Sequence, residues 1–419
     1  MSPIRSTALF AVLVFAGGCT SGMEPVGDAG AVPTAAAPRV ESLPRALTAD
    51  EQKLISASND FSLMLFRQLN AAQKDSNIFT SPLSASISLA MLMTGASGAT
   101  YEQMHNTLLL RSTTDVEVTE GYKSLVTLLR VLDPASDVRI ATSLWTRNGI
   151  PITPAFLDAG MHAFNATVGS LDFASASAAG AINAWAADAT LEKLPAIIDH
   201  TDARQSMLLM NAVLFKGTWS VPFDVALTGP ALFRGAAGNQ TIPMMTRGDM
   251  FGYYASGVFE AVDLPYGNGA YSMTIVLPRS GQSMDAVAVS IQGLSGTLWS
   301  ERLRILPMQL FLPRFRIEWE QTLNADLKAL GMTDAFTPGV ADFGRLSSSG
   351  REIALDVVRQ KTYVQVNEDG TEGAPTQALP PTPGIPFPLI MFVDRPFLVI
   401  IRERLTGTII FVGKVTHIN

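Results

Sequence analysis

An apolar run in the middle of the chain sets the strongest limit on its fold. Residues 206–215 read Ser-Met-Leu-Leu-Met-Asn-Ala-Val-Leu-Phe, with one polar interruption inside the run at Asn211. Because apolar and polar residues do not alternate, the run fits a strand that is buried on both faces of a sheet. Material for a core that encloses such a strand is present, since 47% of the 419 residues are hydrophobic.

Helical patterns gather in the first half of the chain and strand patterns in the second half. The helix expected from Pro82 has Ser81 as its cap, and its apolar residues lie nearly all round, which predicts a buried helix. Other helices are expected over 49–70, around Met104, over 154–164 and 182–189, and over 321–329 before Gly331. Strands are expected over 138–145, 206–215, 259–264, 271–277, 310–317, 353–367, 398–402 and 407–415. This order predicts an α+β fold.

Composition and motifs exclude several classes of function. The net charge of −7 argues against a nucleic-acid binder, which would carry a basic surface. One cysteine, Cys19, allows neither an intrachain disulfide nor a cysteine-based zinc cluster, and the four histidines lack metal-ligand spacing. The chain has no G-x-S-x-G, H-E-x-x-H or phosphate-binding loop motif. We therefore expect neither a metal site nor an enzyme.

The N-terminus has the pattern of an export signal. Arg5 precedes an apolar stretch over 8–16, which is too short for a membrane span but typical of a signal peptide. Small residues then lead to Cys19 and resemble a bacterial lipobox, although Ala16 stands where leucine is usual. We expect a signal over 1–19, a flexible linker over 20–48 and a folded domain over 49–419. Either a lipid-anchored outer-membrane protein or a plain secreted protein with an incidental cysteine would have this pattern.

A proline-rich segment near the C-terminus predicts an exposed loop. Between Glu368 and Pro396 lie 27 residues that include six prolines, an arrangement that favours extended backbone. Loops of this length in a compact domain are usually functional or disordered. Because strand patterns flank the segment closely, we favour a functional loop over 369–394 rather than a disordered linker.

Several segments resemble the serpin family, and they follow one another in serpin order. They cover essentially all of the expected folded domain and lie at 77–84, 89–92, 95–100, 211–219, 264–266, 273–278, 312–315, 330–336, 366–373, 394–398 and 410–415. The resemblance implies a single domain of three β-sheets and eight or nine helices with an exposed reactive-centre loop. It also implies a suicide-substrate inhibitor of a serine or cysteine protease, with no catalytic residue and no cofactor of its own.

In that mechanism the protease cuts the loop and becomes acyl-linked to it, and the loop then inserts as a strand into the central sheet. The resemblance assigns the hinge of the loop to Glu368, Gly370, Thr371, Glu372, Gly373 and Ala374. It assigns the support of the sheet opening to Ser81, Ser84, Asn211, Trp219 and Gln360. Simpler interpretations are a helix cap for Ser81, a surface strand position for Gln360 and a core tryptophan for Trp219. We expect a monomer whose partner is the target protease.

The scissile bond is expected at Gly384–Ile385 or at Ile385–Pro386, with Leu379 and Phe387 as lesser candidates. A small or aliphatic residue before the cut favours an elastase-like or subtilisin-like target. The absence of Lys and Arg from 373–394 argues against a trypsin-like one.

The loop departs from the inhibitory pattern at Pro375, Pro380, Pro381 and Pro383. Proline has no N–H to donate to a sheet and is normally excluded from central strands. Each lost hydrogen bond would cost on the order of 1 kcal/mol, which would slow insertion. A non-inhibitory serpin, or a loop that is cut without trapping the protease, is therefore the alternative.

Overall fold

The computed structural model describes residues 39–293, 301–372 and 389–418. Within these ranges it has eight α-helices: α1 (Ala49–Ala72), α2 (Pro82–Thr94), α3 (Gly98–Thr107), α4 (Asp115–Val131), α5 (Pro154–Asp158), α6 (Ala176–Ala189), α7 (Met284–Gln292) and α9 (Asn324–Ala329). A π-helical turn at Ala159–Ala163 continues α5, so the expected helix over 154–164 is present as two joined pieces. No helix in these ranges is both long and apolar enough to cross a membrane.

Fifteen strands form two hydrogen-bonded sheets in the described part of the chain. One sheet has six strands in the order β10 (Phe315–Thr322), β11 (Leu355–Asn367), β12 (Gly370–Thr371), β4 (Met207–Thr218), β2 (Ser136–Arg147) and β3 (Thr167–Leu171). The other has nine: β1 (Ile78–Thr80), β15 (Ile409–Val415), β14 (Phe397–Glu403), β8 (Tyr271–Pro278), β7 (Phe259–Pro265), β6 (Gly238–Ala255), β9 (Arg304–Pro313), β13 (Leu389–Phe392) and β5 (Gly229–Gly235), which pairs with β6.

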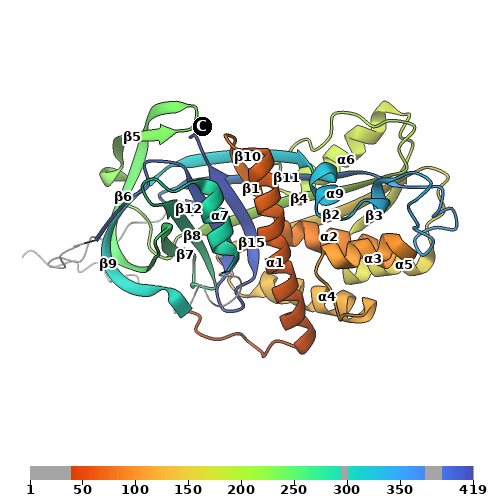
Figure 1. The fold of residues 1–419 in the computed structure, drawn as a ribbon, viewed down its shortest axis with the longest axis horizontal. Helices are drawn as coiled ribbons and strands as arrows, with labels where there is room; N and C mark the ends of the chain where they lie inside the picture. The colour runs from red at the N-terminus through yellow and green to blue at the C-terminus, as the bar shows by residue number, and fades with distance from the viewer. Residues whose placement is uncertain (1–38, 294–300, 373–388, 419) are drawn as a thin grey trace, which may run out of the picture. The chain divides into compact units, whose positions relative to one another are not determined.

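The three sheets that the sequence predicts are present, but two of them are continuous. The long strand β6 pairs with β9 along most of its length and with β7 over its last four residues, Gly252–Ala255. In Figure 1 this strand, in green, curves from one group of strands to the other. Hydrogen bonding through β6 therefore merges two of the expected sheets into the nine-stranded one.

The apolar run at 206–215 forms β4, the central strand of the six-stranded sheet. Alternate residues of β4 face opposite layers, because side chains in a strand alternate between the two faces. Leu208, Met210 and Ala212 pack against α6, whereas Met207, Leu209, Val213 and Phe215 belong to the main core. Helix α2 packs against β4 and β2 and is buried over nearly its whole length, as its all-round apolar pattern predicts.

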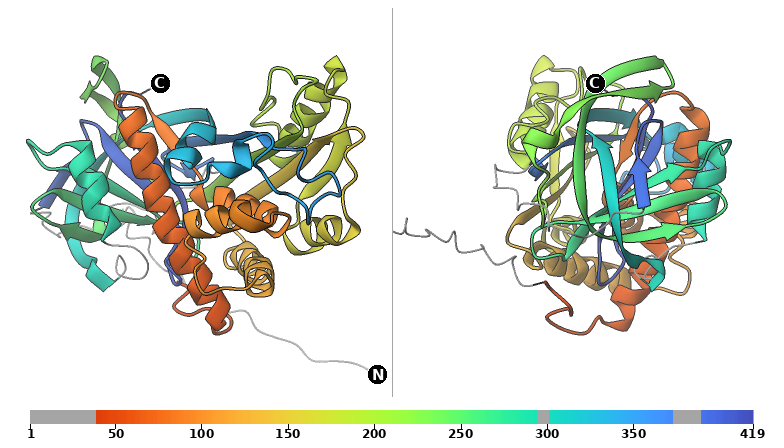
Figure 2. Two further views of the ribbon diagram at one scale, coloured as in Figure 1. Left: turned by 45° about the vertical axis from the view of Figure 1, so that its right-hand side comes forward. Right: turned by 90° about the vertical axis from the view of Figure 1, so that its left-hand side faces the viewer.

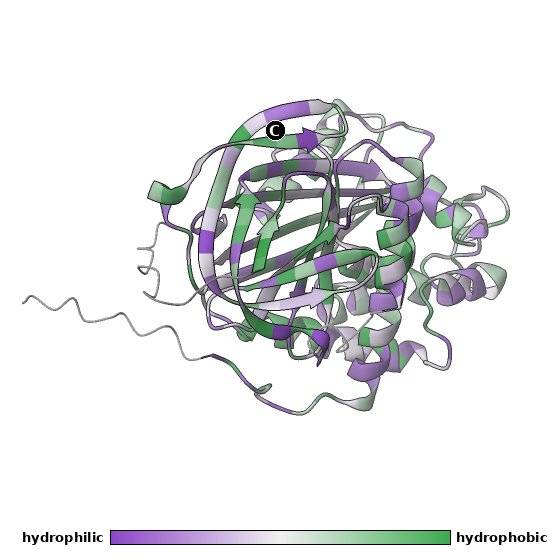
Figure 3. Cartoon of the chain, turned by 60° about the vertical axis from the view of Figure 1, so that its left-hand side comes forward, coloured by the Kyte–Doolittle hydropathy of each residue, from purple (hydrophilic) through white to green (hydrophobic). Residues whose placement is uncertain are grey.

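Helix α1 lies beside β15 and α7 on the nine-stranded sheet (Figures 1 and 2). The hydropathy colours in Figure 3 place hydrophobic residues along the strands of this sheet, whereas α1 carries both kinds of residue. This pattern is that of a helix with one face on the core and one in water.

Two element boundaries differ from the sequence prediction. The strand expected over 310–317 is two strands in different sheets, because β9 ends at Pro313 and β10 begins at Phe315. Proline cannot donate to a ladder, and Arg314 N bonds Pro243 O as the chain crosses between the sheets. The helix expected over 321–329 begins only at Asn324, since Gln321 and Thr322 at the end of β10 still pair with β11.

The sequence prediction also omitted several helices and strands, namely α4, α7, β1, β3, β5, β6, β12 and β13. A signal for α4 was available, because Thr114 and Glu117 form a capping box at its start. The strands β5 and β6 have no clean apolar alternation, because their exposed faces carry apolar residues such as Leu232 and Met250.

Candidate functional site

The start of the predicted reactive loop lies inside the six-stranded sheet. The chain turns back after β11, and β12 (Gly370–Thr371) returns between β11 and β4. Thr371 pairs with Val366 on one side and with Gly217 on the other, and its side chain is fully buried. The hinge is thus already a short strand that separates one end of β11 from β4.

An aromatic pair holds Thr371 in place. The Tyr266 and Thr371 hydroxyl oxygens are 2.6 Å apart, and the Tyr266 ring stacks on Trp219 with ring centroids 4.5 Å apart. Trp219 Nε1 donates to the carbonyl oxygen of Asn367 at 2.9 Å, and its backbone N–H donates to that of Asp369. Burial raises the pKa of Tyr266, so its hydroxyl stays neutral. Trp219 therefore has the core position of the simpler interpretation and also contacts the turn that leads into the hinge.

Position 370 requires glycine because of its backbone conformation and because β4 lies close to it. Its φ is +146°, in a region that favours glycine, and a Cβ there would lie 2.1 Å from the carbonyl oxygen of Gly217. Any other residue would push the strands apart at the point where β12 enters the sheet.

Glu368 anchors the turn before β12. Its carboxylate accepts hydrogen bonds from Arg314 Nε at 2.8 Å and from Thr228 Oγ1 at 2.5 Å, and its side chain is 4% exposed. Burial favours the neutral acid, but the contacts from Arg314 and Thr228 outweigh burial and lower the pKa of Glu368 below its usual value. The turn is therefore held by a charged pair at neutral pH.

Glu372, the last described residue of the hinge, ends the strand in a strained conformation. Its φ is +52°, in the left-handed region that non-glycine residues rarely occupy. Its carboxylate pairs with Lys193 Nζ at 2.6 Å, although its Oε1 atom has no hydrogen-bond partner among the described residues. An ion pair thus restrains the point at which the chain leaves the sheet.

Beyond β12, β11 and β4 pair directly and are joined from beneath by buried polar side chains. Gln360 Oε1 accepts from Ser81 N at 2.8 Å and from Thr80 Oγ1 at 2.7 Å, and Gln360 Nε2 donates to Ser81 O at 2.8 Å. Ser81 Oγ in turn donates to the carbonyl oxygen of Ile410 and also caps α2. Gln360 is fully buried, so it is not a surface strand residue.

Asn211 lies opposite Gln360 on β4 and has one unused polar group. Its Oδ1 atom accepts from Ser84 Oγ at 3.1 Å and from Thr142 Oγ1 at 3.4 Å. Its Nδ2 atom is buried and has no partner among the described residues. An unpaired buried amide costs about 1–3 kcal/mol, so a partner for this group would stabilise the sheet.

The structure brings together most of the residues that the resemblance singled out. Ser81, Ser84, Asn211 and Gln360 form the cluster beneath the paired part of β11 and β4, and Trp219 lies beside β12 with Glu368, Gly370, Thr371 and Glu372. The predicted residues that lie outside the described ranges are Cys19, Gly373, Ala374, Gly384 and Ile385. The signal over 1–19 and most of the linker over 20–48 also lie outside them.

Sequence reasoning missed Tyr266, Lys193 and Arg314 as partners of the hinge. Tyr266 and Arg314 fall in segments that carry the resemblance, but no local pattern connects them with residues more than 50 positions away. Lys193 follows α6 in a loop without any motif. Among the described residues, no group of three or more His, Cys, Asp or Glu side chains could hold a metal ion.

The six-stranded sheet, with β12 entering between β11 and β4 at one end, has the arrangement that the serpin resemblance implies. The profile of the family described as "Serpin (serine protease inhibitor)" matches residues 56–418. The chain therefore belongs to the serpin family.

Relatives with known names agree with this assignment. The chain is 31% identical to mouse leukocyte elastase inhibitor A over 378 residues, which is 87% of this chain and 99% of that protein. It is 30% identical to human neuroserpin, with 85% and 90% covered. The first of these relatives is, by its name, an inhibitor of elastase.

Solved structures show the same fold. Native tengpin, a thermophilic serpin, matches with a TM-score of 0.80 and 28% identity, over 91% of this chain and 97% of that one. Human thyroxine-binding globulin, solved with its hormone, matches with a TM-score of 0.82 and 28% identity, over 88% and 100%.

Proposed function

We propose that the protein inhibits a serine or cysteine protease as a suicide substrate. The nucleophilic oxygen or sulfur of the protease would bond to the carbonyl carbon before the cut, and the amine of the following residue would leave. The freed loop would then insert between β11 and β4 and carry the acyl-linked protease away before water hydrolyses the ester. The observation that carries this proposal is β12, because the first two residues of that new strand already pair with both neighbours.

The register of the sheet supports insertion without sliding. Tyr363 pairs directly with Leu214, and Val366 lies across β12 from Gly217; both pairs are 149 residues apart in the sequence. The two strands therefore keep the same offset where they touch and where β12 separates them. They need only move apart sideways to admit the rest of the loop.

The unpaired amide of Asn211 supports the same proposal. A strand that continued β12 in register would place Gln377 between Gln360 and Asn211, on the same face of the sheet. Gln377 lies outside the described residues. Its side-chain oxygen would be the acceptor that Asn211 Nδ2 lacks in the uncut protein, so insertion would remove a buried unsatisfied donor.

The prolines of the loop support a second candidate, a serpin that is cut without trapping. In the same register Pro375 would lie between Thr362 and Val213, where it could not donate to the ladder. Such losses would slow insertion and give the acyl bond time to hydrolyse. The protein would then act as a substrate or as a binding module.

We further propose an elastase-like or subtilisin-like target and a cut beside Gly384 or Ile385. The deciding experiment incubates the chain with elastase-, subtilisin-, chymotrypsin-, trypsin- and papain-like proteases and analyses the products on an SDS gel and by mass spectrometry. An inhibitor gives an SDS-resistant complex with the mass of both partners, and a protease without its nucleophile gives none. If every active protease released only cleaved chain, the second candidate would replace the first.

We propose that the protein works as a monomer outside the cytoplasm, either secreted or held in the envelope by a lipid on Cys19. Growth of an expressing bacterium with labelled palmitate tests the lipid anchor. Label should appear in the natural chain and be lost in the variant Cys19→Ser. Export without label in either chain would indicate a plain secretory signal.

A further inference from the structure

A second polar site lies in the nine-stranded sheet, next to the segments that carry Trp219 and Tyr266. A cavity of about 520 Å³ opens where β6, β7 and β9 meet the end of β14. Four arginines from three parts of the chain line it: Arg39, Arg247, Arg402 and Arg404. Only two acidic residues line it with them, Asp249 and Asp263. The cavity is thus cationic in a protein whose net charge is −7.

Two of these arginines have buried N–H groups without a partner. The Arg402 side chain is 1% exposed, and its Nη1 atom has no hydrogen-bond partner among the described residues. Arg247 Nε likewise donates to no hydrogen-bond acceptor among the described residues, and its ion-pair partner Asp249 Oδ2 is 3.7 Å away. Unsatisfied buried donors are rare in proteins and cost more when they are charged, so these groups point to an absent acceptor.

The arginine side chains are held in place before any ligand arrives. Arg402 Nη2 donates to Asp263 Oδ1 at 3.1 Å, and Arg404 donates to the carbonyl oxygens of Gly269 and Val40 at 2.7 and 2.8 Å. The guanidinium carbon of Arg247 lies 4.8 and 4.6 Å from the ring centroids of Phe223 and Phe251. A ligand would therefore lose little affinity to the ordering of these side chains.

Burial lowers the pKa of two of these arginines, Arg247 and Arg404. Burial lowers the pKa of Arg247 to about 10, which still leaves the group protonated at neutral pH. Burial and the neighbouring charge of Arg39 lower the pKa of Arg404. An anion between these groups would offset both burial and repulsion.

The mouth of the cavity is apolar. Met250 and Ile305 line it and are 48% and 55% exposed, among the most exposed large apolar side chains of the described residues. Leu303 lies beside them. The cavity therefore combines fixed cationic donors inside with an apolar rim.

We propose that this cavity binds a small amphipathic organic anion. Its acidic head would accept hydrogen bonds from Arg402 Nη1 and Arg247 Nε, since guanidinium donors match carboxylate and phosphate oxygens. Its apolar part would lie against Met250 and Ile305. None of the hinge residues from Glu368 to Glu372 lines the cavity, so binding can be measured without a protease.

Isothermal titration calorimetry of the full chain tests the proposal with four probes: octanoate, octyl phosphate, octanol and inorganic sulfate. We expect one molecule of octanoate or octyl phosphate per chain, and the tighter of the two identifies the preferred head group. Octanol lacks the anionic head group and sulfate lacks the apolar part, so each should bind at least tenfold more weakly than the octyl anions. Equal binding of either one, or no binding of the two octyl anions, would overturn the proposal.

Three variants locate the site. Arg402→Lys keeps a cation beside Asp263 but removes the free N–H, and Ile305→Asp places a repelling charge at an exposed position of the mouth. Each should weaken binding of the octyl anion at least tenfold. Leu232→Asp is the matched control, because Leu232 is a 45% exposed apolar residue on β5 of the same sheet outside the cavity lining. Unchanged affinity in Ile305→Asp, or an equal loss in Leu232→Asp, would place the binding elsewhere.

Discussion

At the scale of single residues, Thr371 is a position where the hinge tolerates little change. Its side chain is fully buried between Val366 and Gly217 and bonds Tyr266. Thr371→Arg would place a charge there without an acidic partner, which costs several kcal/mol. We expect the hinge of this variant to leave the sheet, so that the protease cuts the chain without being trapped. The number of moles of chain needed to inhibit one mole of protease should then rise at least tenfold.

The matched control for that change is Thr371→Ser, which keeps the hydroxyl and the small volume. It should trap the protease nearly as the natural chain does. Trapping that survived Thr371→Arg would show that β12 is not the start of the inserting strand.

A second residue-scale prediction concerns Gln377, the partner we propose for Asn211. Gln377→Leu should leave the unfolding free energy of the uncut protein unchanged within about 0.5 kcal/mol and lower that of the cut protein by about 1–3 kcal/mol, because the buried amide stays unpaired. Denaturant titration of both forms measures the difference. Thr376→Val, one position away and facing the other layer, should show no such difference between the two forms. Equal effects of Gln377→Leu on cut and uncut protein would contradict the register.

At the scale of elements, the inserting strand is limited by its prolines. Pro375→Ala would restore one N–H to a central strand and with it about 1 kcal/mol of ladder hydrogen bonding. We expect faster insertion and a larger trapped fraction, measured as the ratio of complex to cleaved chain on an SDS gel. Pro388→Ala is the control, since it follows the proposed cut and does not enter the sheet. A trapped fraction unchanged by Pro375→Ala would show that this proline does not limit insertion.

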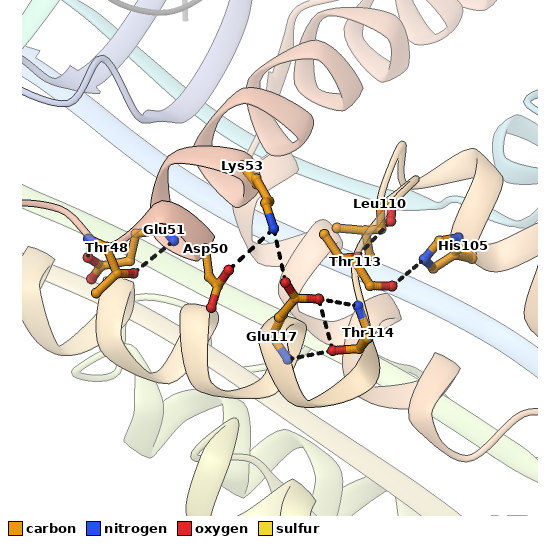
Figure 4. Close-up of polar contacts among 9 residues, drawn as sticks. All are labelled: Thr48, Asp50, Glu51, Lys53, His105, Leu110, Thr113, Thr114 and Glu117. Atoms are coloured by element: carbon orange, nitrogen blue, oxygen red, sulfur yellow. Dashed lines mark hydrogen bonds and ion pairs between the residues drawn. The ribbon is translucent and has the colours of Figure 1, made fainter.

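The start of α1 provides a pH-dependent element. Thr48 and Glu51 form a capping box there, near the Lys53 pairs that link α1 to α4 (Figure 4). Glu51 is fully buried; hydrogen bonding from Arg45 outweighs burial and, with the Thr48 N–H, lowers the pKa of Glu51 from 4.5 to about 2. A carboxyl with a depressed folded-state pKa stabilises the protein above its unfolded pKa and loses that effect as pH falls through the folded one.

Glu51→Gln should therefore cost about 1–3 kcal/mol of unfolding free energy at pH 7, and the cost should shrink as pH falls from about 4.5 to about 2. Urea titrations of both chains across this range measure it. Asp50→Asn, on the exposed side of the same turn, should cost less than about 0.5 kcal/mol. A cost for Glu51→Gln that stayed constant with pH would show that the capping carboxylate does not carry the charge effect.

At the scale of the whole molecule, the proposed mechanism requires an uncut form that is less stable than the cut one. Insertion would add a central strand to the six-stranded sheet, with about 1 kcal/mol for each hydrogen bond gained. We expect cleavage near Gly384 to raise the melting temperature by several degrees or more. Calorimetry before and after cleavage measures this, and the cut Thr371→Arg variant should show no increase. An unchanged melting temperature in the natural chain would rule out insertion.

Most of the fold could be predicted from the sequence where buried apolar residues follow a regular pattern along the chain. The apolar run at 206–215 predicted the central strand β4, and Ser81 with Pro82 predicted the start of α2. The prediction failed at Pro313, because the single strand expected over 310–317 is divided there between two sheets. It also failed at α4, because the capping box at the start of that helix was overlooked. The resemblance identified Ser81 and Gln360, but nothing local indicated that the Gln360 amide would hold the backbone of Ser81.

The sequence by itself determined the α+β class and the family, because each depends on local periodicity or on segments that follow one another in order. The tertiary structure alone decided that Thr371 lies in the sheet against Tyr266, that Asn211 has a free amide, and that arginines far apart in sequence share one cavity. These contacts depend on strand register and on how the sheets are joined. Strand register pairs residues that lie up to hundreds of positions apart in the sequence. No single stretch of the chain therefore carries a pattern that predicts it.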